Sequence, residues 1–252
     1  MELDGKRTLI TGAARGLGQA TAALFTERGA KVAIADLDGD AAEQAAAELN
    51  SGAIGFACDV TKSAEVKAAI DKTVETFGGM DILVNNAGIE IGKPLPELSD
   101  EEFDLIFAVN VNGVFYGIKH ATPVMAGAGG GVILNMSSVA GLGGVPLLGA
   151  YCATKAAVLR LTQTAAIELR DYNIRVNAIC PSFIDTAMVE RLVAPFEAAT
   201  GAEFGDVVAM KQSRLGTAAE VAETVAFLAS DEASFITGSQ YVLDMALTAS
   251  VL

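Results

Sequence analysis

The 252-residue sequence has no tryptophan, a single histidine (His120) and only three cysteines, at positions 58, 152 and 180. The cysteines lie far apart and show no Cys-x-x-Cys spacing, so neither a zinc site nor a disulfide framework is predicted. One histidine also argues against a histidine-based metal centre. We therefore expect three small, buried cysteines and no bound metal.

Positive charge is also scarce. The chain carries 17 Lys and Arg against 31 Asp and Glu, a formal net charge of −14. Nucleic acids and anionic membranes are bound through basic patches, so we expect neither as a partner. No apolar run approaches the ~18 residues of a membrane span, and residues 1–7 lack the apolar segment of a signal peptide. The expected location is the cytoplasm.

Short apolar runs alternate with alanine-rich amphipathic stretches along the whole chain. Strands are predicted at Arg7–Thr11, Lys31–Ala35, Ile54–Ala57, Ile82–Val84, Val132–Asn135, Arg175–Ile179 and Tyr241–Leu243. Helices are predicted at Leu17–Arg28, Asp40–Leu49, Ser63–Phe77, Asp100–Met125, Ala150–Asp171 and Ala218–Ala229. This alternation predicts an α/β fold with a doubly wound parallel sheet, in one domain over residues 1–252. Residues 185–214 are weakly patterned, and we predict that they form a substrate lid.

A glycine-rich segment, Thr11–Gly18, lies between the first strand and the first helix. Its glycines permit a tight turn and let the backbone approach a pyrophosphate at the helix N-terminus. The position between strand and helix makes the signal more specific than glycines alone. The residues predicted to bind a dinucleotide here are Gly12, Arg15, Gly16, Leu17 and Gly18.

The end of the second strand bears on the choice of cofactor. A carboxylate at Asp36 accepts hydrogen bonds from the adenosine ribose hydroxyls and repels a 2′-phosphate, which favours NAD over NADP. Leu37 follows where a basic residue would help to bind that phosphate, although Arg15 is an opposing signal. Asp59, after the third strand, either pairs with the adenine amino group or caps the next helix. Val60 beside it belongs to the same predicted site.

Tyr151 and Lys155 are four residues apart in a predicted helix, and Ser138 lies thirteen residues before Tyr151. Positions i and i+4 share one helix face. A tyrosine loses its proton near pH ~10, and a cation ~4 Å away at an effective dielectric of ~20 favours the phenolate by about 4 kcal/mol before desolvation. The sequence thus predicts that Lys155 lowers the pKa of Tyr151 into the range of a general base. With the nucleotide signature, this pair predicts hydride transfer between a nicotinamide and an alcohol or ketone.

The combined motifs resemble those of the short-chain dehydrogenase/reductases, in their single-domain branch. The resemblance covers essentially the whole chain, from Gly5 to Asp244, and the residues that carry it are Thr11–Gly18, Asn85-Asn86-Ala87-Gly88, Asn110, Ser138, Tyr151 and Lys155. The resemblance implies a Rossmann-type sheet of seven parallel strands, an NAD(P) cofactor and a homotetramer, with a homodimer as the alternative.

The resemblance also implies a role for each motif residue. Tyr151 is the implied acid/base, Lys155 lowers its pKa and binds the nicotinamide ribose, and Ser138 holds the substrate oxygen. Asn110 is implied to hold a water that links Lys155 to solvent. The implied cofactor contacts are Asn86, Ala87 and Gly88 beside the adenosine ribose, and Pro181, Ile184 and Thr186 beside the nicotinamide carboxamide.

Two stretches depart from the family pattern. The family usually has Pro-Gly where this chain has Pro181-Ser182, followed by the bulky Phe183. The common Asp-Gly-Gly near the C-terminus is replaced by Asp244-Met245-Ala246. These changes put the placement of the nicotinamide and the pocket wall in question, but they remove no catalytic group.

The segments expected around the substrate carry few charges. Their apolar residues are Ile89, Ile91, Val139, Leu142, Val145, Leu148, Phe183, Met188, Leu192, Val193, Phe196 and Met210. An apolar wall favours a hydrophobic secondary alcohol or ketone, of alicyclic, aromatic or steroidal type. One alternative is an NADPH-dependent ketone or 3-oxoacyl-[acyl carrier protein] reductase. Another is a nucleotide-sensing protein without catalysis, but the presence of all four catalytic residues argues against it.

Overall fold

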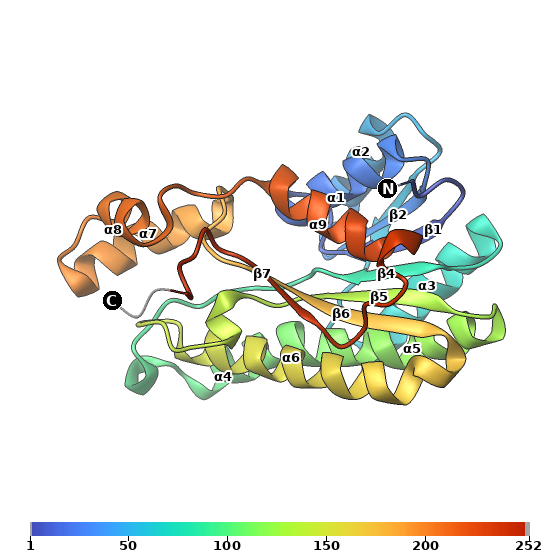
Figure 1. Ribbon diagram of the computed structural model, residues 1–252. Coiled ribbons are helices and arrows are strands. Elements are labelled where there is room, and N and C mark those ends of the chain that lie inside the picture. The colour runs from blue at the N-terminus through green and yellow to red at the C-terminus, as the bar shows by residue number, and fades with distance from the viewer. Residues whose placement is uncertain (1, 250–252) are drawn as a thin grey trace.

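The computed structural model describes residues 2–249 and contains one seven-stranded parallel sheet, in the order β3-β2-β1-β4-β5-β6-β7 (Figure 1). The strands are β1 (Arg7–Thr11), β2 (Lys31–Asp36), β3 (Ile54–Ala57), β4 (Ile82–Asn85), β5 (Gly131–Met136), β6 (Ile174–Pro181) and β7 (Gln240–Leu243). The order reverses between β1 and β4, the switch point at which ligands bind in such sheets. The predicted doubly wound fold is confirmed.

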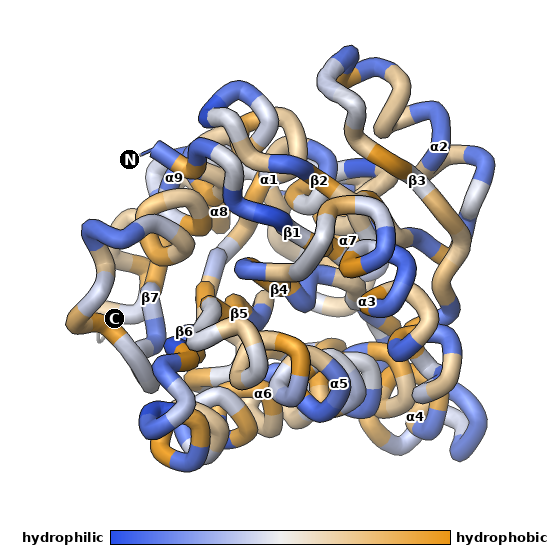
Figure 2. Tube along the Cα trace, turned by 90° about the vertical axis from the view of Figure 1, so that its right-hand side faces the viewer, coloured by the Kyte–Doolittle hydropathy of each residue, from blue (hydrophilic) through white to orange (hydrophobic). Residues whose placement is uncertain are grey.

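Helices cover both faces of the sheet, as Figures 1 and 2 show. One face carries α1 (Gly16–Glu27), α2 (Gly39–Glu48) and α9 (Ala218–Ala229), and the other carries α3 (Ser63–Phe77), α5 (Gly113–Gly127) and α6 (Gly149–Leu169). The remaining helices are α4 (Asp100–Phe107), α7 (Ala187–Thr200) and α8 (Phe204–Gln212), with 3₁₀ turns at Leu95–Glu97, Val139–Gly141, Arg170–Tyr172 and Asp231–Ala233. No helix within residues 2–249 combines the length and hydropathy needed to cross a membrane.

The central strands are apolar on both faces because each face is covered. Ile10 and Ile34 point into the cluster shared with α1 and α9, whereas Leu9 and Leu83 point into the cluster shared with α3 and α5. All four side chains are fully buried. Burial of such a side chain contributes about 1.5–3 kcal/mol, so the two clusters hold the strands in register and present their carboxyl ends at one edge.

The helix predicted over Asp100–Met125 is not continuous. A π-helical turn at Ala108–Asn112 separates α4 from α5. At this turn the Asn110 side chain bonds to the backbone of Ile89, accepting from its N–H and donating to its carbonyl, both at 2.9 Å. Single π turns interrupt α-helices at functional positions more often than elsewhere, and this one turns Asn110 inward, with no exposed surface.

The stretch predicted as a weakly patterned lid, residues 185–214, is instead largely helical, forming α7 and α8. Phe204 stacks edge-on against Phe183 and Phe196, with ring centroids 5.2 and 5.5 Å apart. Gln212 donates to the Phe183 carbonyl at 2.7 Å and accepts from its N–H at 3.1 Å. None of the fourteen residues of α7, all of which the structure describes, is buried. Phe183, Phe196 and Phe204 thus form a small aromatic cluster beside α8. The side chains of α7 are only partly covered by the rest of the protein.

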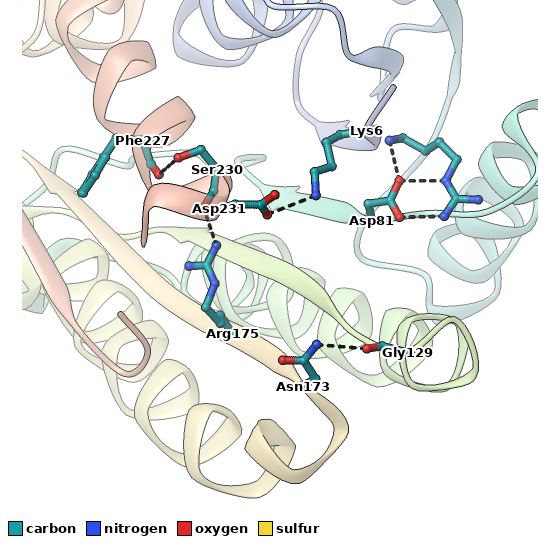
Figure 3. A network of polar contacts seen from close by, with 9 residues as sticks. Lys6, Asp81, Gly129, Asn173, Arg175, Phe227, Ser230 and Asp231 are labelled. Carbon is teal, nitrogen blue, oxygen red and sulfur yellow. Dashed lines mark hydrogen bonds and ion pairs between the residues drawn. The ribbon is translucent and has the colours of Figure 1, made fainter. Parts of the chain in front are cut away.

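A polar network joins the elements at the amino ends of the strands (Figure 3). The Arg7 guanidinium donates to both oxygens of Asp81, at 2.7 and 2.6 Å, and to the Gly78 carbonyl at 2.8 Å. Burial pushes the pKa of Asp81 up, but the Arg7 bonds and charge outweigh it and lower that pKa. Lys6 pairs with Asp231 at 3.2 Å. These contacts tie β1 to the start of β4 and to the segment after α9.

Candidate active site

A cavity of about 450 Å³ opens at the carboxyl ends of the strands, across the switch point of the sheet. Most of the residues predicted for the site line it: Gly12, Arg15, Gly16, Leu17, Asp36, Asp59, Val60, Asn86, Ala87, Gly88, Ser138, Tyr151, Lys155, Pro181, Ile184 and Thr186. Gly18 and Asn110 are not part of this lining and lie behind it. Residues distant in sequence are thus brought to one hollow.

The glycine loop forms a cradle that side chains would fill. Gly12 has φ +61°, and a Cβ there would lie 2.6 Å from the Cα of Ala87. A Cβ on Gly18 would lie 2.6 Å from the Gly12 carbonyl oxygen. Gly16, with φ +59°, faces open space. Arg15 precedes α1 without capping it through its side chain, and the first helical residues, Gly16 and Leu17, line the cavity. The start of a helix in this position fits an anionic group such as a pyrophosphate.

Asp36 holds this loop against β2. The carboxylate is 8% exposed and accepts hydrogen bonds from the backbone N–H of Ala14 at 3.0 Å and of Asp38 at 3.2 Å. Each carboxylate oxygen retains a further acceptor position. The neighbouring Leu37 is 75% exposed and brings no positive charge to this part of the cavity. The Asp36 carboxylate, which lines the cavity, thus keeps acceptor positions for a further hydrogen-bond donor.

Asp59 stabilises its own turn. One oxygen accepts from the N–H and hydroxyl of Thr61, at 3.0 and 2.7 Å, and the other lies 3.3 Å from the Lys62 ammonium. The Thr61 hydroxyl bond is the main cause of the lowered pKa of Asp59. Thr61 precedes α3, whose N-cap residue is Lys62 and which has no side-chain cap, so Asp59 stabilises the turn before the helix rather than capping it. Asp59 also borders the cavity.

Asn86 connects the end of β4 to the glycine loop, Thr11–Gly18. Its side-chain amide donates to the carbonyls of Thr11 and Gly12, at 3.0 and 2.7 Å. The Thr11 hydroxyl accepts from the N–H groups of Asn86 and Ala87. These bonds hold the two strand ends at the switch point together and fix the floor of the cavity.

Asn110 acts behind the cavity wall. Besides holding Ile89, its amide donates to the Thr154 hydroxyl at 3.1 Å, and that hydroxyl donates to the Tyr151 carbonyl at 2.7 Å. A Cβ on Gly88 would lie 3.3 Å from the Asn110 side-chain oxygen and 3.4 Å from the Lys155 ammonium. The π turn, the loop after β4 and the first turn of α6 thus form one hydrogen-bonded unit.

Ser138 and Tyr151 both line the cavity, and their side chains are hydrogen-bonded. Ser138 is 9% exposed, donates to the Pro181 carbonyl at 3.2 Å and accepts from the Ala140 N–H at 3.1 Å. Burial raises the pKa of Tyr151, and its hydrogen bond with Ser138 opposes that rise without cancelling it. The expectation that Lys155 brings this pKa down is therefore wrong for the protein alone.

The position of Lys155 explains why it does not lower the pKa of Tyr151. Its ammonium donates to the Met136 carbonyl at 2.8 Å and lies 5.4 Å from the centroid of the Tyr151 ring, over the ring rather than at the phenolic oxygen. Burial lowers the pKa of Lys155 to about 8, with Cys180 opposing the fall. Sequence spacing places the two residues together, but it carries no information on the desolvation of either group.

The two departures from the family pattern have visible consequences. The Ser182 hydroxyl donates to the Leu243 carbonyl at 3.1 Å, so this serine links the cavity edge to β7. Met245 and Ala246 have φ +47° and +68°, a left-handed conformation that strains residues with a Cβ. Asp244 supports the turn by accepting from the N–H groups of Ala246 and Thr248, at 3.0 and 2.7 Å.

Few residues of the predicted substrate wall line this cavity. Of its twelve apolar residues, only Ile89 and Met188 line the cavity. Phe183 and Phe196 pack against Phe204 of α8, and Met210 is 72% exposed. Lining residues outside the predicted site and wall are Leu37, Cys58, Val109, Met136, Ser137, Ser182, Ala187, Val189 and Arg191. Arg191 was missed because a helix was not predicted over α7. Within residues 2–249, no group of three or more His, Cys, Asp or Glu is arranged to hold a metal.

The chain matches the family model described as enoyl-(acyl carrier protein) reductase over residues 12–248. It is 40% identical to the sorbitol dehydrogenase of Cereibacter sphaeroides, over 97% of this chain and 98% of that protein. It is 39% identical to the cyclohexanol dehydrogenase of Acinetobacter sp. (strain SE19), over 98% and 96%. The structure of an NAD⁺-bound xylitol dehydrogenase superimposes with a TM-score of 0.90 at 34% identity, covering 97% of this chain and 99% of that one. The chain belongs to the short-chain dehydrogenase/reductase family of oxidoreductases.

Proposed function

We propose that this protein is an NAD-dependent oxidoreductase that interconverts a hydrophobic secondary alcohol and its ketone. The observation that carries the proposal is the shared cavity: Ser138, Tyr151 and Lys155 line the same hollow as the glycine loop and Asp36. A nucleotide held by the loop thus reaches the hydroxyl groups that would hold an alcohol oxygen. The relatives named for sorbitol and cyclohexanol support the reaction class.

The residues present fit NAD. The loop glycines and the uncapped start of α1 would hold the pyrophosphate, and Asp36 would accept from the adenosine ribose. Lys155 would bind the nicotinamide ribose, with Pro181, Ile184 and Thr186 beside the ring. When bound, NAD supplies the hydride acceptor. The NAD⁺-bound xylitol dehydrogenase supports this assignment.

The chain's own residues would manage the proton. Ser138 would donate to the substrate oxygen, and Tyr151 would give a proton to a ketone or take one from an alcohol. Burial raises the pKa of Tyr151, so the phenol keeps its proton near neutral pH and is suited to ketone reduction. Alcohol oxidation needs that proton removed and should accelerate as the pH rises. Asn110 would hold a water for this proton path from behind Ile89.

Arg15 supports a second candidate. This residue also lines the cavity, and its guanidinium is able to pair with a 2′-phosphate. With NADPH the protein would then act as a ketone or 3-oxoacyl-[acyl carrier protein] reductase. Asp36 argues for the first candidate because a carboxylate at contact distance from a phosphate is repulsive.

Oxidation of a panel of cyclic and aromatic secondary alcohols, followed by NADH absorbance with NAD and with NADP, tests the proposal. We expect kcat/KM with NAD to exceed that with NADP at least tenfold. In Asp36→Ala, the removal of the repulsive charge should shift the NAD/NADP ratio of kcat/KM by about 10- to 100-fold toward NADP. A wild-type preference for NADPH, unchanged in this variant, would support the reductase candidate instead.

We also propose that the protein is a homotetramer. Large apolar side chains are exposed on α4, α5 and α6, including Phe103 (42%), Phe115 (46%) and Ile167 (66%). Exposed apolar side chains on several helices are available for burial in an interface between subunits. Light scattering after size exclusion should give a mass near four times 25.8 kDa, and a monomer mass at micromolar concentration would contradict the proposal.

A further inference from the structure

An ion pair joins the cavity edge to helix α7. Glu90 follows Ile89 in the loop after β4, and Arg191 lies on α7, 101 residues away. The Arg191 Nε donates to the Glu90 Oε1 at 3.1 Å, and its Nη2 lies 3.0 Å from the same oxygen. The Glu90 side chain is only 6% exposed, whereas that of Arg191 is 63% exposed. A nearly buried carboxylate therefore holds a guanidinium that reaches the surface.

Glu90 is held rigidly by the body of the protein. Asn110 binds both backbone groups of Ile89, the preceding residue, at 2.9 Å. Arg191 is the one charged partner of Glu90 among the described residues, and burial keeps the pKa of this carboxyl raised even so. Such a pair contributes little net stability, because desolvation offsets the attraction between the charges. Its position beside the cavity points to recognition rather than to folding.

Only one member of the pair lines the cavity. Arg191 is part of the same lining as Ser138 and Tyr151, and Glu90 is not. A guanidinium has five N–H groups, and Glu90 takes those of Nε and Nη2. The remaining donors belong to a fork whose orientation Glu90 sets. The neighbouring lining is apolar, with Ile89, Met188 and Val189.

We propose that Arg191, oriented by Glu90, binds a second, neutral oxygen atom of the substrate, so that the preferred substrates carry a further hydroxyl or carbonyl besides the reacting one. This inference rests on the proposed function and deepens it. Glu90 is a positioning residue in this account, and Arg191 determines specificity.

The chemistry favours a neutral group. Glu90 cancels the charge of Arg191, so the pair offers directed N–H donors without a net attraction for an anion. An alcohol with no second oxygen would displace water from these donors without bonding to them, and the loss of those hydrogen bonds is costly. Sites built to hydrogen-bond a substrate group reject analogues that lack it far more strongly than apolar walls reject a missing methylene.

Matched substrates and variants test the proposal. The kcat and KM of cyclohexanol are compared with those of cyclohexane-1,2-, -1,3- and -1,4-diol, in the wild type, Arg191→Gln, Arg191→Lys and Glu90→Gln. Arg214→Gln serves as the control, because Arg214 pairs with Glu220 at 2.6 Å beyond the other end of the same helical segment and does not line the cavity. Circular dichroism and thermal unfolding confirm that each variant folds.

We expect at least one diol to exceed cyclohexanol tenfold or more in kcat/KM. In Arg191→Gln this ratio should fall to within about threefold of unity, mainly through KM. Arg191→Lys should recover little of it, because an ammonium lacks the planar fork. In Glu90→Gln the ratio of kcat/KM for the diol to that for cyclohexanol should fall in part, because the guanidinium is no longer held in place. In Arg214→Gln the ratio should be unchanged.

Two results overturn the inference while leaving the proposed function intact. The first is a wild type that oxidises cyclohexanol at least as well as every diol. The second is an equal loss for all four alcohols in Arg191→Gln, which would mean that the ion pair only holds α7 in place. If none of the four alcohols is oxidised although other alcohols of the panel are, the inference fails alone. If no alcohol of the panel is oxidised with either NAD or NADP, the proposed function fails and the inference fails with it.

Discussion

The two ends of the parallel sheet use polar side chains in different ways. At the amino ends, side chains of opposite charge pair with each other, as Arg7 does with Asp81 and Lys6 with Asp231. At the carboxyl ends, polar side chains mostly bond to backbone: Asp36 to Ala14, Asn86 to Gly12 and Lys155 to Met136. Backbone bonds fix these side chains in place but leave donors and acceptors free for a ligand. The amino ends are thus built for stability, and the carboxyl ends are built for binding.

Features that destabilise the folded protein lie at the carboxyl ends of the strands. Lys155 is 4% exposed, and its lowered pKa means that burying its ammonium is unfavourable. Met245 and Ala246 add left-handed backbone strain nearby. Costs of this kind are typical of functional sites, where stability is given up for geometry. The comparison between the two ends therefore predicts opposite effects of substitution.

The largest effect is expected for Lys155→Met, which separates activity from stability. Turnover should fall about 100-fold or more, since the acid–base unit loses its cation. Stability near pH 7 should rise by about 1–3 kcal/mol, because the pKa of Lys155 falls from 10.5 to about 8 on folding and each unit is worth about 1.4 kcal/mol, less the lost bond to Met136.

The size of this stability gain depends on pH. Lysine binds more protons in the unfolded state between pH 8 and 10.5, so wild-type stability from this group rises with pH in that window. The advantage of Lys155→Met should be complete below pH 8 and fade toward pH 10.5. Urea unfolding of both proteins at several pH values measures it, and a variant less stable than wild type at pH 7 would show that burial of the ammonium is not costly.

The next effect belongs to the amino ends. Arg7→Met leaves Asp81 without its guanidinium partner and should lower the free energy of unfolding by about 1–3 kcal/mol, with kcat unchanged. The pKa of Asp81 is lowered in the folded protein, so the pair stabilises above its unfolded pKa and this contribution is lost as the pH falls into the acid range. Lys6→Met, which removes an exposed pair, is the control and should stay within about 0.5 kcal/mol of wild type.

The smallest effect is expected at the strained C-terminal turn. Ala246 has φ +68°, which costs about 1–2 kcal/mol for a residue with a Cβ, whereas glycine adopts it freely. Ala246→Gly should therefore stabilise the protein by about 0.5–1 kcal/mol after the greater entropy of the unfolded glycine chain is subtracted. Thermal unfolding measures the shift, with Ala249→Gly as a matched control that should show no gain.

The sequence predicts the fold well because the alternation of apolar runs is a local property. All seven strands are found where the apolar runs occur, and Thr11–Gly18 forms the predicted turn. The π turn around Asn110 was not predictable, since the helical period continues through it and the cause is a tertiary bond to Ile89. Arg191 was missed for a related reason: its partner Glu90 is 101 residues away, which no local pattern reports. The pKa of Tyr151 depends on burial, which spacing alone does not give.

The central claim, that Tyr151 carries the proton at the carboxyl end of the sheet, is tested most directly by Tyr151→Phe. Single-turnover hydride transfer and the binding of NADH, followed by fluorescence, are measured in the same variant. The account predicts a loss of about 10²–10⁴-fold in hydride transfer with NADH affinity within about threefold of wild type. Hydride transfer at the wild-type rate would contradict it.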